Sequence, residues 1–405
     1  MNDLFETLAS DPAVRLADRA RSQGLYPYGL PLEESEGTEV VLHGRRLMMA
    51  GSNNYLGLTD HPHVRAAAVA AVERYGTSCT GSRFMNGTLE MHLVLEERFA
   101  RFLGKEAALV FATGYQSNLG AITALMHEDH VAVCDKDIHA SVIDAVLMAG
   151  AQLARFRHND PDALDLMLKE HAGTPAMVIV DGVYSMGGDL AQLPELAAVA
   201  QRHGARLFVD DAHGLGAVGP GGTGTAAHFG RTADVDVVMG TFSKSFASVG
   251  GVIAGSADVI EVIRHNGRSL IFSASLPPPS AAAALAALDV LEAEPERPVL
   301  AHRHADRVRA ELRAAGYDCG ASQSPIVPVF IGDELATLAA WQSLIERGVY
   351  TNPVISPAVP PGRGMLRTSF MATHSGEQVG RLIDAFRDVL PLSTLPATTP
   401  QEPPG

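Results

Sequence analysis

RLFVDDAHGLG, residues 206–216, is a short apolar run that ends in two aspartates, a histidine and two glycines. Its first part, Arg206–Asp210, has little polar alternation, as expected of a strand buried on both faces of a parallel sheet. Similar runs occur at Ala107–Thr113, Val131–Asp135, Ala176–Asp181, Val235–Gly240 and Gly251–Ala254. Stretches with helical spacing, such as Leu193–His203, lie between them. This alternation predicts an α/β domain with a mostly parallel central sheet, right-handed crossovers and helices on both faces.

The pattern changes after a long predicted helix, Ala281–Glu294, which ends before two prolines. A helix around His302–Ala315, strands near Ile326–Ile331 and a helix after Ser375 predict a smaller α+β lobe. A chain of 405 residues is also long enough for two lobes. The expected parts are residues 1–55 (an N-terminal arm and part of the small lobe), 56–295 (the large domain), 296–391 (the small domain) and 392–405 (a disordered tail).

The composition excludes several classes of protein. A net charge of −15 argues against binding to nucleic acid or to anionic membranes. No apolar run is long enough for a transmembrane helix, and the N-terminus lacks the apolar core of a signal peptide. The three cysteines are far apart, which argues against a disulfide framework and a zinc cluster. We therefore expect an enzyme of the cytoplasm.

Polar residues follow the predicted strands, where doubly wound sheets bind their ligands. In GTFSKS (Gly240–Ser245), Lys244 comes just after a strand among hydroxyl residues. A lysine there can form a Schiff base if its pKa is lowered, and Thr241 and Ser243 can bind a phosphate. The alternative for an isolated lysine is a solvent-exposed loop residue.

Asp210 and His213 follow the strand Arg206–Asp210 at a spacing that lets both reach one flat heterocycle. Asp210 would keep a pyridine nitrogen protonated, which makes the ring an electron sink, and His213 would hydrogen-bond a phenolic oxygen. The alternatives are a surface turn or a metal site. A metal is disfavoured because no second ligand cluster has a suitable spacing; residues 127–130 (HEDH) do not form HExxH.

Further residues fit a bound pyridoxal 5′-phosphate (PLP). His139, in DKDIHAS, can stack on a ring, although a histidine at a strand end is often structural. Gly114 and Tyr115 open a predicted helix whose free N–H groups favour a phosphate. Arg367, on a strand of the small lobe, either pairs internally or offers a two-pronged contact to a carboxylate. Together these residues predict PLP held by Lys244.

A competing motif lies in the same region. Gly214–Gly219 matches GxGxxG, the dinucleotide-binding fingerprint, which would indicate an NAD-dependent dehydrogenase. That fingerprint must open directly into a helix, whereas Pro220 and further glycines follow here. The loop also lacks the GK[ST] of a phosphate-binding P-loop. A dinucleotide site is therefore disfavoured.

From about Gly24 to Leu390 the chain resembles the α-oxoamine synthases, fold-type I PLP enzymes that condense an amino acid with an acyl thioester and release CO2. The resemblance rests on ordered motifs. They are SNNYLGL (52–58), GTSCTGSRFMNGT (76–88), FATGYQSNLG (111–120), DKDIHAS (135–141), DGVYSMGGD (181–189), VDDAHGLG (209–216), GTFSKS (240–245) and FSASLPP (272–278).

The resemblance implies a role for each matching residue. Lys244 binds PLP covalently and removes the Cα proton; Asp210 and His213 bind the ring nitrogen and the 3′-oxygen, and His139 stacks on the ring. The other implied site residues are Gly114, Tyr115, Thr241 and Ser243 at the phosphate, Ser273 reaching the phosphate from a partner subunit, Ser185 beside the cofactor, and Asn53 and Arg367 at the substrate. A homodimer with shared active sites follows from this assignment, and no metal is expected.

Within the family, TGSRFMNGT (80–88) is most similar to the serine palmitoyltransferases. This implies condensation of L-serine with a long-chain acyl thioester, such as palmitoyl-CoA, to a 3-ketosphinganine-like α-aminoketone, as in sphingolipid biosynthesis. Glycine or alanine stays open as the amino acid, because Asn53 stands where bacterial members can carry Tyr and Ile355-Ser356 replace a frequent arginine. The segment GLYPYGLP (24–31) offers no arginine for a CoA phosphate, so an acyl carrier protein is an alternative donor.

Two other interpretations also compete with this one. One is another fold-type I reaction, such as that of an aminotransferase or an aldolase. The other is a non-catalytic subunit of a heterodimeric synthase. A non-catalytic subunit could dispense with the lysine, so the presence of Lys244, Asp210, His213 and His139 argues against it.

Overall fold

The computed structural model describes residues 3, 5, 8 and 11–389. Its centre is a seven-stranded sheet in the order β4-β10-β9-β8-β7-β5-β6. The strands are β4 (Ala107–Phe111), β5 (Val131–Asp135), β6 (Gln152–Phe156), β7 (Ala176–Asp181), β8 (Arg206–Asp210), β9 (Val237–Thr241) and β10 (Gly251–Gly255). The pairings from β9 to β6 are parallel, and β10 runs antiparallel to both β4 and β9. The predicted mostly parallel sheet is confirmed.

Helices cover both faces of this sheet, because alternate strand residues point to opposite sides. In β7, Met177 and Ile179 belong to one hydrophobic core and Val178 and Val180 to the other. The first core includes residues of α5 (Gly114–Leu125), α6 (Ala140–Ala149) and α10 (Ala257–Asn266). The second includes residues of α4 (Glu90–Phe102), α7 (Pro161–Glu170), α8 (Leu193–Arg202) and α12 (Pro278–Ala293). Two buried faces explain why the strands read as nearly continuous apolar runs.

Further helices and turns complete the large lobe. Helix α3 (Pro62–Tyr75) packs along α12. The remaining elements are α9 (Thr225–His228), α11 (Arg268–Ile271) and the 3-10 turns Pro220–Gly222 and Thr232–Asp234. The GxGxxG stretch is followed by these turns, and the Gly216 N–H donates to the Gly222 carbonyl oxygen at 2.7 Å. It therefore opens into no long helix and lacks the geometry of a dinucleotide fingerprint.

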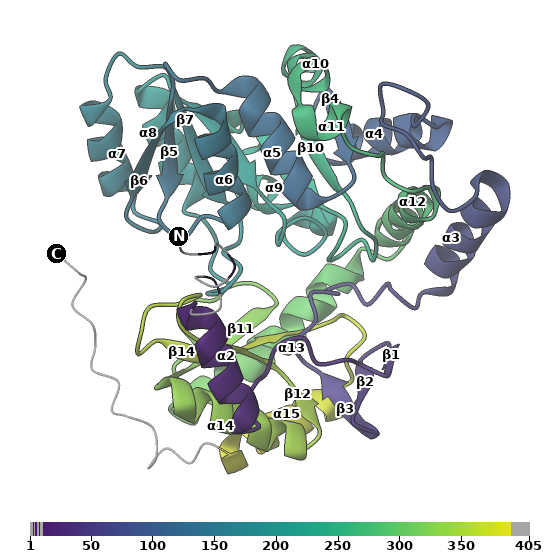
Figure 1. Ribbon diagram of the computed structural model, residues 1–405, viewed down its shortest axis with the longest axis vertical. Helices are drawn as coiled ribbons and strands as arrows, with labels where there is room; N and C mark the ends of the chain where they lie inside the picture. Colours follow the sequence, from purple (N-terminus) through teal and green to yellow (C-terminus); the bar gives the residue numbers. More distant parts are fainter. Residues whose placement is uncertain (1–2, 4, 6–7, 9–10, 390–405) are drawn as a thin grey trace.

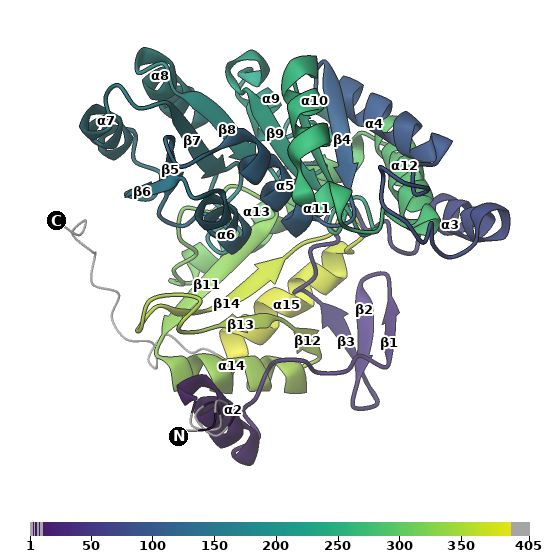
Figure 2. The same cartoon turned by 45° about the horizontal axis from the view of Figure 1, so that its top comes forward.

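The small lobe lies below the large one in Figures 1 and 2 and contains two sheets. One sheet has β1 (Glu34–Glu36), β2 (Glu39–Leu42), β3 (Arg45–Met49) and β12 (Val349–Tyr350). The other has β11 (Ile326–Gly332), β14 (Gly364–Ser369) and β13 (Asn352–Val354). The helices of this lobe are α2 (Pro12–Ser22), α13 (Glu296–Ala314), α14 (Glu334–Glu346) and α15 (Gly376–Val389). Strand β3 pairs with β12, so the N-terminal segment is joined to the C-terminal one.

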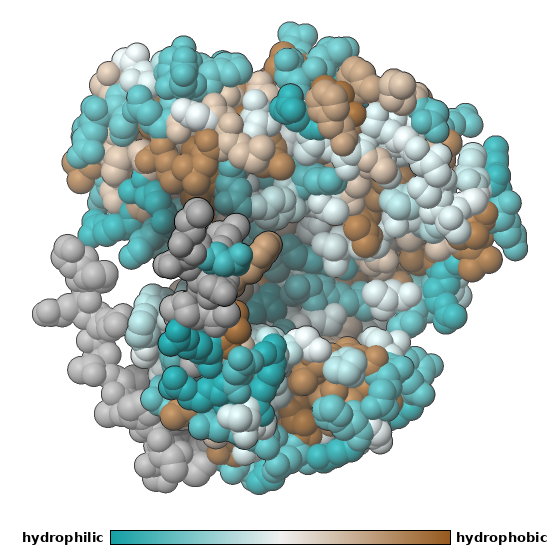
Figure 3. Space-filling view, in the orientation of Figure 1, coloured by the Kyte–Doolittle hydropathy of each residue, from teal (hydrophilic) through white to brown (hydrophobic). Residues whose placement is uncertain are grey.

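The surface is hollowed between the two lobes (Figure 3). The carboxyl ends of the parallel strands face this hollow, since Arg367 of β14 contacts the loop after β7. The predicted disordered tail, 392–405, lies outside the described residues. No helix in the described part of the chain is both long and apolar enough to cross a membrane.

Candidate active site

A cavity of about 280 Å³ opens at the carboxyl ends of β7, β8 and β9, beside the start of α5. The predicted residues that line it are Gly114, Tyr115, His139, Asp210, His213, Thr241, Ser243 and Lys244. The sheet therefore brings together side chains that are up to 130 positions apart in the sequence. Asn53, Ser185, Ser273 and Arg367 do not line this cavity but contact its surroundings, as described below.

Lys244 lies in the turn after β9, half-buried, with its ammonium group in reach of two carboxyl groups. Burial lowers the pKa of Lys244 to about 8, although the charges of Asp210 and Asp181 oppose this shift. At pH 7 about a tenth of the amine is therefore unprotonated and nucleophilic, far more than for an ordinary lysine.

Asp210 ends β8 and is 4% exposed. Its Oδ2 accepts a hydrogen bond from Asn118 Nδ2 at 2.7 Å, and its Oδ1 accepts one from the Ala212 N–H at 3.1 Å. Asn118, on α5, also donates to Ser141 Oγ at 2.8 Å. Two donors hold this carboxylate in place. Asn118 was not among the predicted site residues, because nothing in the sequence links it to Asp210.

The ring of His213 is contacted by Tyr55, a fully buried residue. The Tyr55 hydroxyl lies 2.8 Å from His213 Nδ1 and 3.2 Å from Asn53 Oδ1. Burial, helped by the positive charge of Lys244, lowers the pKa of His213 well below its usual value. The imidazole is therefore neutral and carries a single N–H donor. Tyr55 was not predicted individually, although it belongs to the SNNYLGL motif.

Arg367 reaches from β14 of the small lobe to the large lobe and is 5% exposed. Its Nε donates to the Ser185 carbonyl oxygen at 2.6 Å, and its Nη2 donates to Asn53 Oδ1 at 3.0 Å. Both partners are neutral, and no ion pair of Arg367 occurs in the described part of the chain. These two hydrogen bonds leave the positive charge of Arg367 without a carboxylate, as a carboxylate-binding residue requires.

The start of α5 has the groups that an anion site needs. The Thr113 side chain caps the helix by accepting from the Gln116 N–H at 3.1 Å. A Cβ at Gly114 would lie 2.9 Å from Thr241 Oγ1, so only glycine fits beside β9. Thr241 Oγ1 and Ser243 Oγ lie 2.9 Å apart at the same place. Free N–H groups of a helix start next to two hydroxyls suit a phosphate.

Tyr115 and Ser273 lie at the outer side of the same helix start. The exposed Tyr115 hydroxyl donates to Asp144, and Ser273 Oγ accepts from Gln116 Nε2 at 3.0 Å. Ser273 is thus near the predicted phosphate site of its own chain.

His139 and Asp181 complete the cavity. His139 begins α6, its ring is exposed, and its Nδ1 lies 2.7 Å from Ser141 Oγ. Asp181 pairs with Asp210 in the β7–β8 register and is buried. Burial, and then the charge of Asp210, raise the pKa of Asp181 well above its usual value. Asp181 therefore binds a proton more readily than an ordinary aspartate does.

Sequence reasoning did not find Asp181, although it opens the DGVYSMGGD motif. Among the described residues, no group of three or more His, Cys, Asp or Glu side chains is arranged to hold a metal ion. A larger cavity, about 620 Å³, lies at the opposite ends of the strands, near Lys105 and at the start of β8 (Arg206). It contains none of the predicted site residues.

Comparison with known proteins now identifies the family. Residues 45–386 match the aminotransferase class I and II family. The chain belongs to this family. Its relatives in the family include a serine palmitoyltransferase of Sphingobacterium spiritivorum, 44% identical over 370 residues, which are 91% of this chain and 93% of the relative. They also include an 8-amino-7-oxononanoate synthase of Geobacter sulfurreducens, 45% identical, with 90% and 94% covered.

Solved structures in the family agree with this assignment. The Sphingomonas wittichii serine palmitoyltransferase is 37% identical, with a TM-score of 0.93 over 98% of this chain and 100% of that one. A serine palmitoyltransferase solved with PLP is 34% identical, with a TM-score of 0.93 over 97% and 100%. The predicted resemblance to α-oxoamine synthases, and to serine palmitoyltransferases among them, is confirmed.

Proposed function

We propose that this chain is a PLP-dependent acyltransferase that condenses L-serine with a long-chain acyl thioester to an α-aminoketone, with release of CO2 and a free thiol. One observation carries the proposal: a half-buried lysine of lowered pKa shares a cavity with a buried carboxylate, while an arginine without a carboxylate partner lies beside it. The similarity to serine palmitoyltransferases supports the choice of serine and a long acyl chain.

The residues of the cavity fit PLP in size and chemistry. Lys244 would hold the aldehyde carbon, Asp210 the ring nitrogen and His213 the 3′-oxygen, with His139 over the ring. The phosphate would lie at the start of α5, and its partners would be Gly114, Tyr115, Thr241, Ser243 and Ser273. When bound, PLP supplies an electron sink for the pair of electrons left on the amino acid's Cα.

The chain's own residues then perform the remaining tasks. Arg367 and Asn53 would orient the amino-acid carboxylate, with Ser185 holding the arginine through its carbonyl oxygen. The Lys244 amine, once displaced by the substrate, would take the Cα proton, because its lowered pKa makes it a base near neutral pH. Asp210 would keep the ring nitrogen protonated.

The substrate pair has a second candidate. The 8-amino-7-oxononanoate synthase of Geobacter sulfurreducens is as similar in sequence as the first serine palmitoyltransferase, which favours an alternative with another small amino acid. The thioester carrier, CoA or an acyl carrier protein, is a separate question that the same assay addresses.

We also propose that the protein works in the cytoplasm, in sphingolipid biosynthesis, as a homodimer with active sites at its interface. Large apolar side chains in two segments near the cavity support the dimer: Met85 is 81% exposed and Phe272 is 74% exposed. The segments lie together, since the Ser275 N–H donates to the Gly81 carbonyl oxygen at 3.0 Å. In a dimer Ser273 would reach the partner's phosphate site. Within its own chain Ser273 contacts Gln116, so the alternative is that it serves the phosphate site of its own chain.

The experiment has three stages. The purified protein should show the visible absorption of a PLP–lysine adduct, and borohydride should attach the cofactor irreversibly to Lys244 but leave Lys244→Ala unlabelled. The protein should then be titrated with serine, glycine and alanine in turn. Serine should change the absorption spectrum to a saturating extent. Thiol release should then require serine and a long-chain acyl-CoA. A colourless protein that cannot be loaded with PLP would disprove the proposal, and a response to glycine or alanine but not to serine would move the function to the second candidate.

A further inference from the structure

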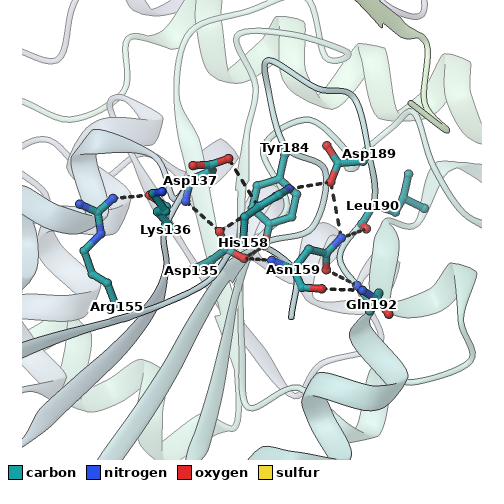
Figure 4. Close-up of polar contacts among 10 residues, drawn as sticks. All are labelled: Asp135, Lys136, Asp137, Arg155, His158, Asn159, Tyr184, Asp189, Leu190 and Gln192. Carbon is teal, nitrogen blue, oxygen red and sulfur yellow. Dashed lines mark hydrogen bonds and ion pairs between the residues drawn. The ribbon is translucent and has the colours of Figure 1, made fainter. Parts of the chain in front are cut away.

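A second cluster of charged side chains lies next to the active site, and the proposed mechanism does not use it. Figure 4 shows His158 between two carboxylates from different loops. His158 Nδ1 lies 3.0 Å from Asp135 Oδ1, and His158 Nε2 lies 3.0 Å from Asp189 Oδ2. We call these three residues, His158, Asp135 and Asp189, the His158 clamp.

The clamp holds a charged imidazole. Burial disfavours the cation, but the hydrogen bonds to Asp135 and Asp189 outweigh burial and raise the pKa of His158 to about 10. The side chain of Asp135 is fully buried and that of Asp189 is 14% exposed, so water screens these contacts poorly. Two further titratable groups face the ring, Asp137 at 3.7 Å and the edge-on Tyr184 ring at 4.3 Å between centroids. Because both ring nitrogens donate, only the protonated form satisfies both carboxylates.

The clamp joins loops that carry active-site residues. Asp135 ends β5, four positions before His139, and its Oδ1 also accepts from the Asp137 N–H at 2.8 Å. Its Oδ2 accepts from the Tyr184 hydroxyl at 2.8 Å and from the Asn159 N–H at 2.7 Å. The fully buried carboxylate therefore ties the loop of His139 to the loop after β7.

The loop after β7 contains a turn, residues 184–189, whose first and last residues are both hydrogen-bonded to the clamp. Tyr184 is bound to Asp135, and Asp189 is bound to His158. Within the turn, the Tyr184 N–H donates to the Asp189 carbonyl oxygen at 3.0 Å and the Gly188 N–H donates to the Tyr184 carbonyl oxygen at 2.8 Å. Ser185, whose carbonyl oxygen accepts from Arg367, lies between the two anchored residues.

The same turn supports the small lobe. The Gly188 carbonyl oxygen accepts from the N–H groups of Gln323 and Ser324, at 3.0 and 3.1 Å. Gly188 has φ +70°, and a Cβ there would lie 2.7 Å from the Ile326 carbonyl oxygen, so the backbones touch closely. Residues 184–189 therefore form one of the two contacts that place Arg367, in the small lobe, against the large lobe; the other is with Asn53.

We propose that the His158 clamp is a positioning device for the substrate-carboxylate subsite: it fixes the turn 184–189, against which Arg367 is held. The proposal rests on the proposed function, because it takes Arg367 as the carboxylate-binding residue. His158 contacts none of the cavity residues that would hold PLP, so its effect falls on the amino acid more than on the cofactor. A purely structural role would instead lower stability without this selectivity.

The test uses His158→Gln and the milder Asp189→Asn in the full-length protein loaded with PLP. Each variant removes one charge from the clamp, so the dissociation constant for serine, from spectral titration, should rise about tenfold. The affinity for PLP should change less than about twofold, because the cavity residues are untouched. His203→Gln is the matched control: His203 Nε2 also lies 2.8 Å from a carboxylate, Asp165 Oδ1, but far from the turn. This control should leave serine binding unchanged.

A second readout needs no cofactor. Amide hydrogen exchange of residues 184–190 in the PLP-free protein should accelerate by about tenfold or more in His158→Gln, while α5 keeps its protection. Unchanged serine binding in both clamp variants would overturn the proposal, as would an equal loss of serine and PLP affinity. A wild-type protein that binds no PLP would disprove the proposed function and this proposal with it. If the wild type binds PLP and serine but the clamp variants do not weaken serine binding, only the proposal for the clamp is disproved.

Discussion

At the scale of single residues, the lowered pKa of Lys244 has a direct consequence for cofactor loading. The neutral amine attacks the PLP aldehyde, and burial lowers the pKa of this amine to about 8. The rate at which the cofactor-free protein takes up PLP should therefore rise with pH, reach half of its maximum near pH 8 and level off above about pH 9. Stopped-flow absorbance between about pH 6 and 10 measures this rate. A rate that continues to rise to pH 10 would indicate an ordinary lysine.

Tyr55 offers a second test at this scale. Tyr55→Phe removes the hydroxyl that holds His213 Nδ1 and Asn53 Oδ1 and leaves both groups without this partner. Because the Tyr55 hydroxyl is fully buried, water cannot easily replace it, and kcat/KM for serine should fall roughly 5- to 100-fold while the protein stays folded. The matched control is Tyr317→Phe, whose hydroxyl donates to the Phe386 carbonyl oxygen at 3.3 Å in the small lobe. Steady-state kinetics that leave the two variants indistinguishable would contradict a role for Tyr55 at the site.

The predicted residues that line the cavity share one property: each ends or follows a strand or opens a helix. Parallel strands end at one edge of the sheet, so residues such as Asp210 and Lys244 are brought together by the topology alone. Asn118, Tyr55 and His158 act through contacts with residues far away in the chain. Sequence spacing carries no information on such contacts, so these residues could be found only in the structure.

At the scale of elements, the start of α5 links stability to cofactor binding. Thr113→Ala removes the side-chain cap of the Gln116 N–H, so the free energy of unfolding should fall by about 1 kcal/mol. The same change disturbs the helix start that would hold the phosphate, so the PLP dissociation constant should rise. Ser256→Ala removes the cap of α10, away from the cavity, and should lower stability alone. Urea unfolding and PLP titration separate the two effects; equal PLP affinity in both variants would argue against a phosphate site here.

Strand β6, which was not among the predicted strands, shows why some elements escape prediction. In β6 (QLARF) only Ala154 and Phe156 are buried, because the strand is at the edge of the sheet and lacks the continuous apolar run of the central strands. The order of the strands and the antiparallel direction of β10 are likewise set by tertiary packing. The central strands, buried on both faces, were predictable within a few residues.

At the scale of the whole molecule, the His158 clamp predicts how stability depends on pH. The folded-state pKa of His158, about 10, lies above the usual histidine value of 6.5. The stability that the clamp contributes is therefore fully present below about pH 6.5 and is lost as pH rises through 10. With some screening at its partly exposed edge, the difference in unfolding free energy between wild type and His158→Gln should be about 2 to 4 kcal/mol below pH 6.5. Denaturant unfolding at several pH values tests this, and a difference that grows with pH would refute a charged clamp.

The proposed dimer gives the last prediction, because it involves the whole surface around the cavity. Met85 and Phe272 are among the most exposed large apolar side chains, and a second copy of the chain would bury them. The double variant Met85→Glu/Phe272→Glu should raise the dimer dissociation constant by at least about a hundredfold, since charged groups would enter the interface. Leu166→Glu, at a 60% exposed position on α7 at the far end of the sheet (Figure 1), is the matched control and should stay dimeric. Sedimentation velocity measures the association. If Ser273 serves the partner's phosphate site, the double variant should lose PLP affinity as it dissociates; a monomer that binds PLP as tightly as the wild type would show that each chain completes its own site.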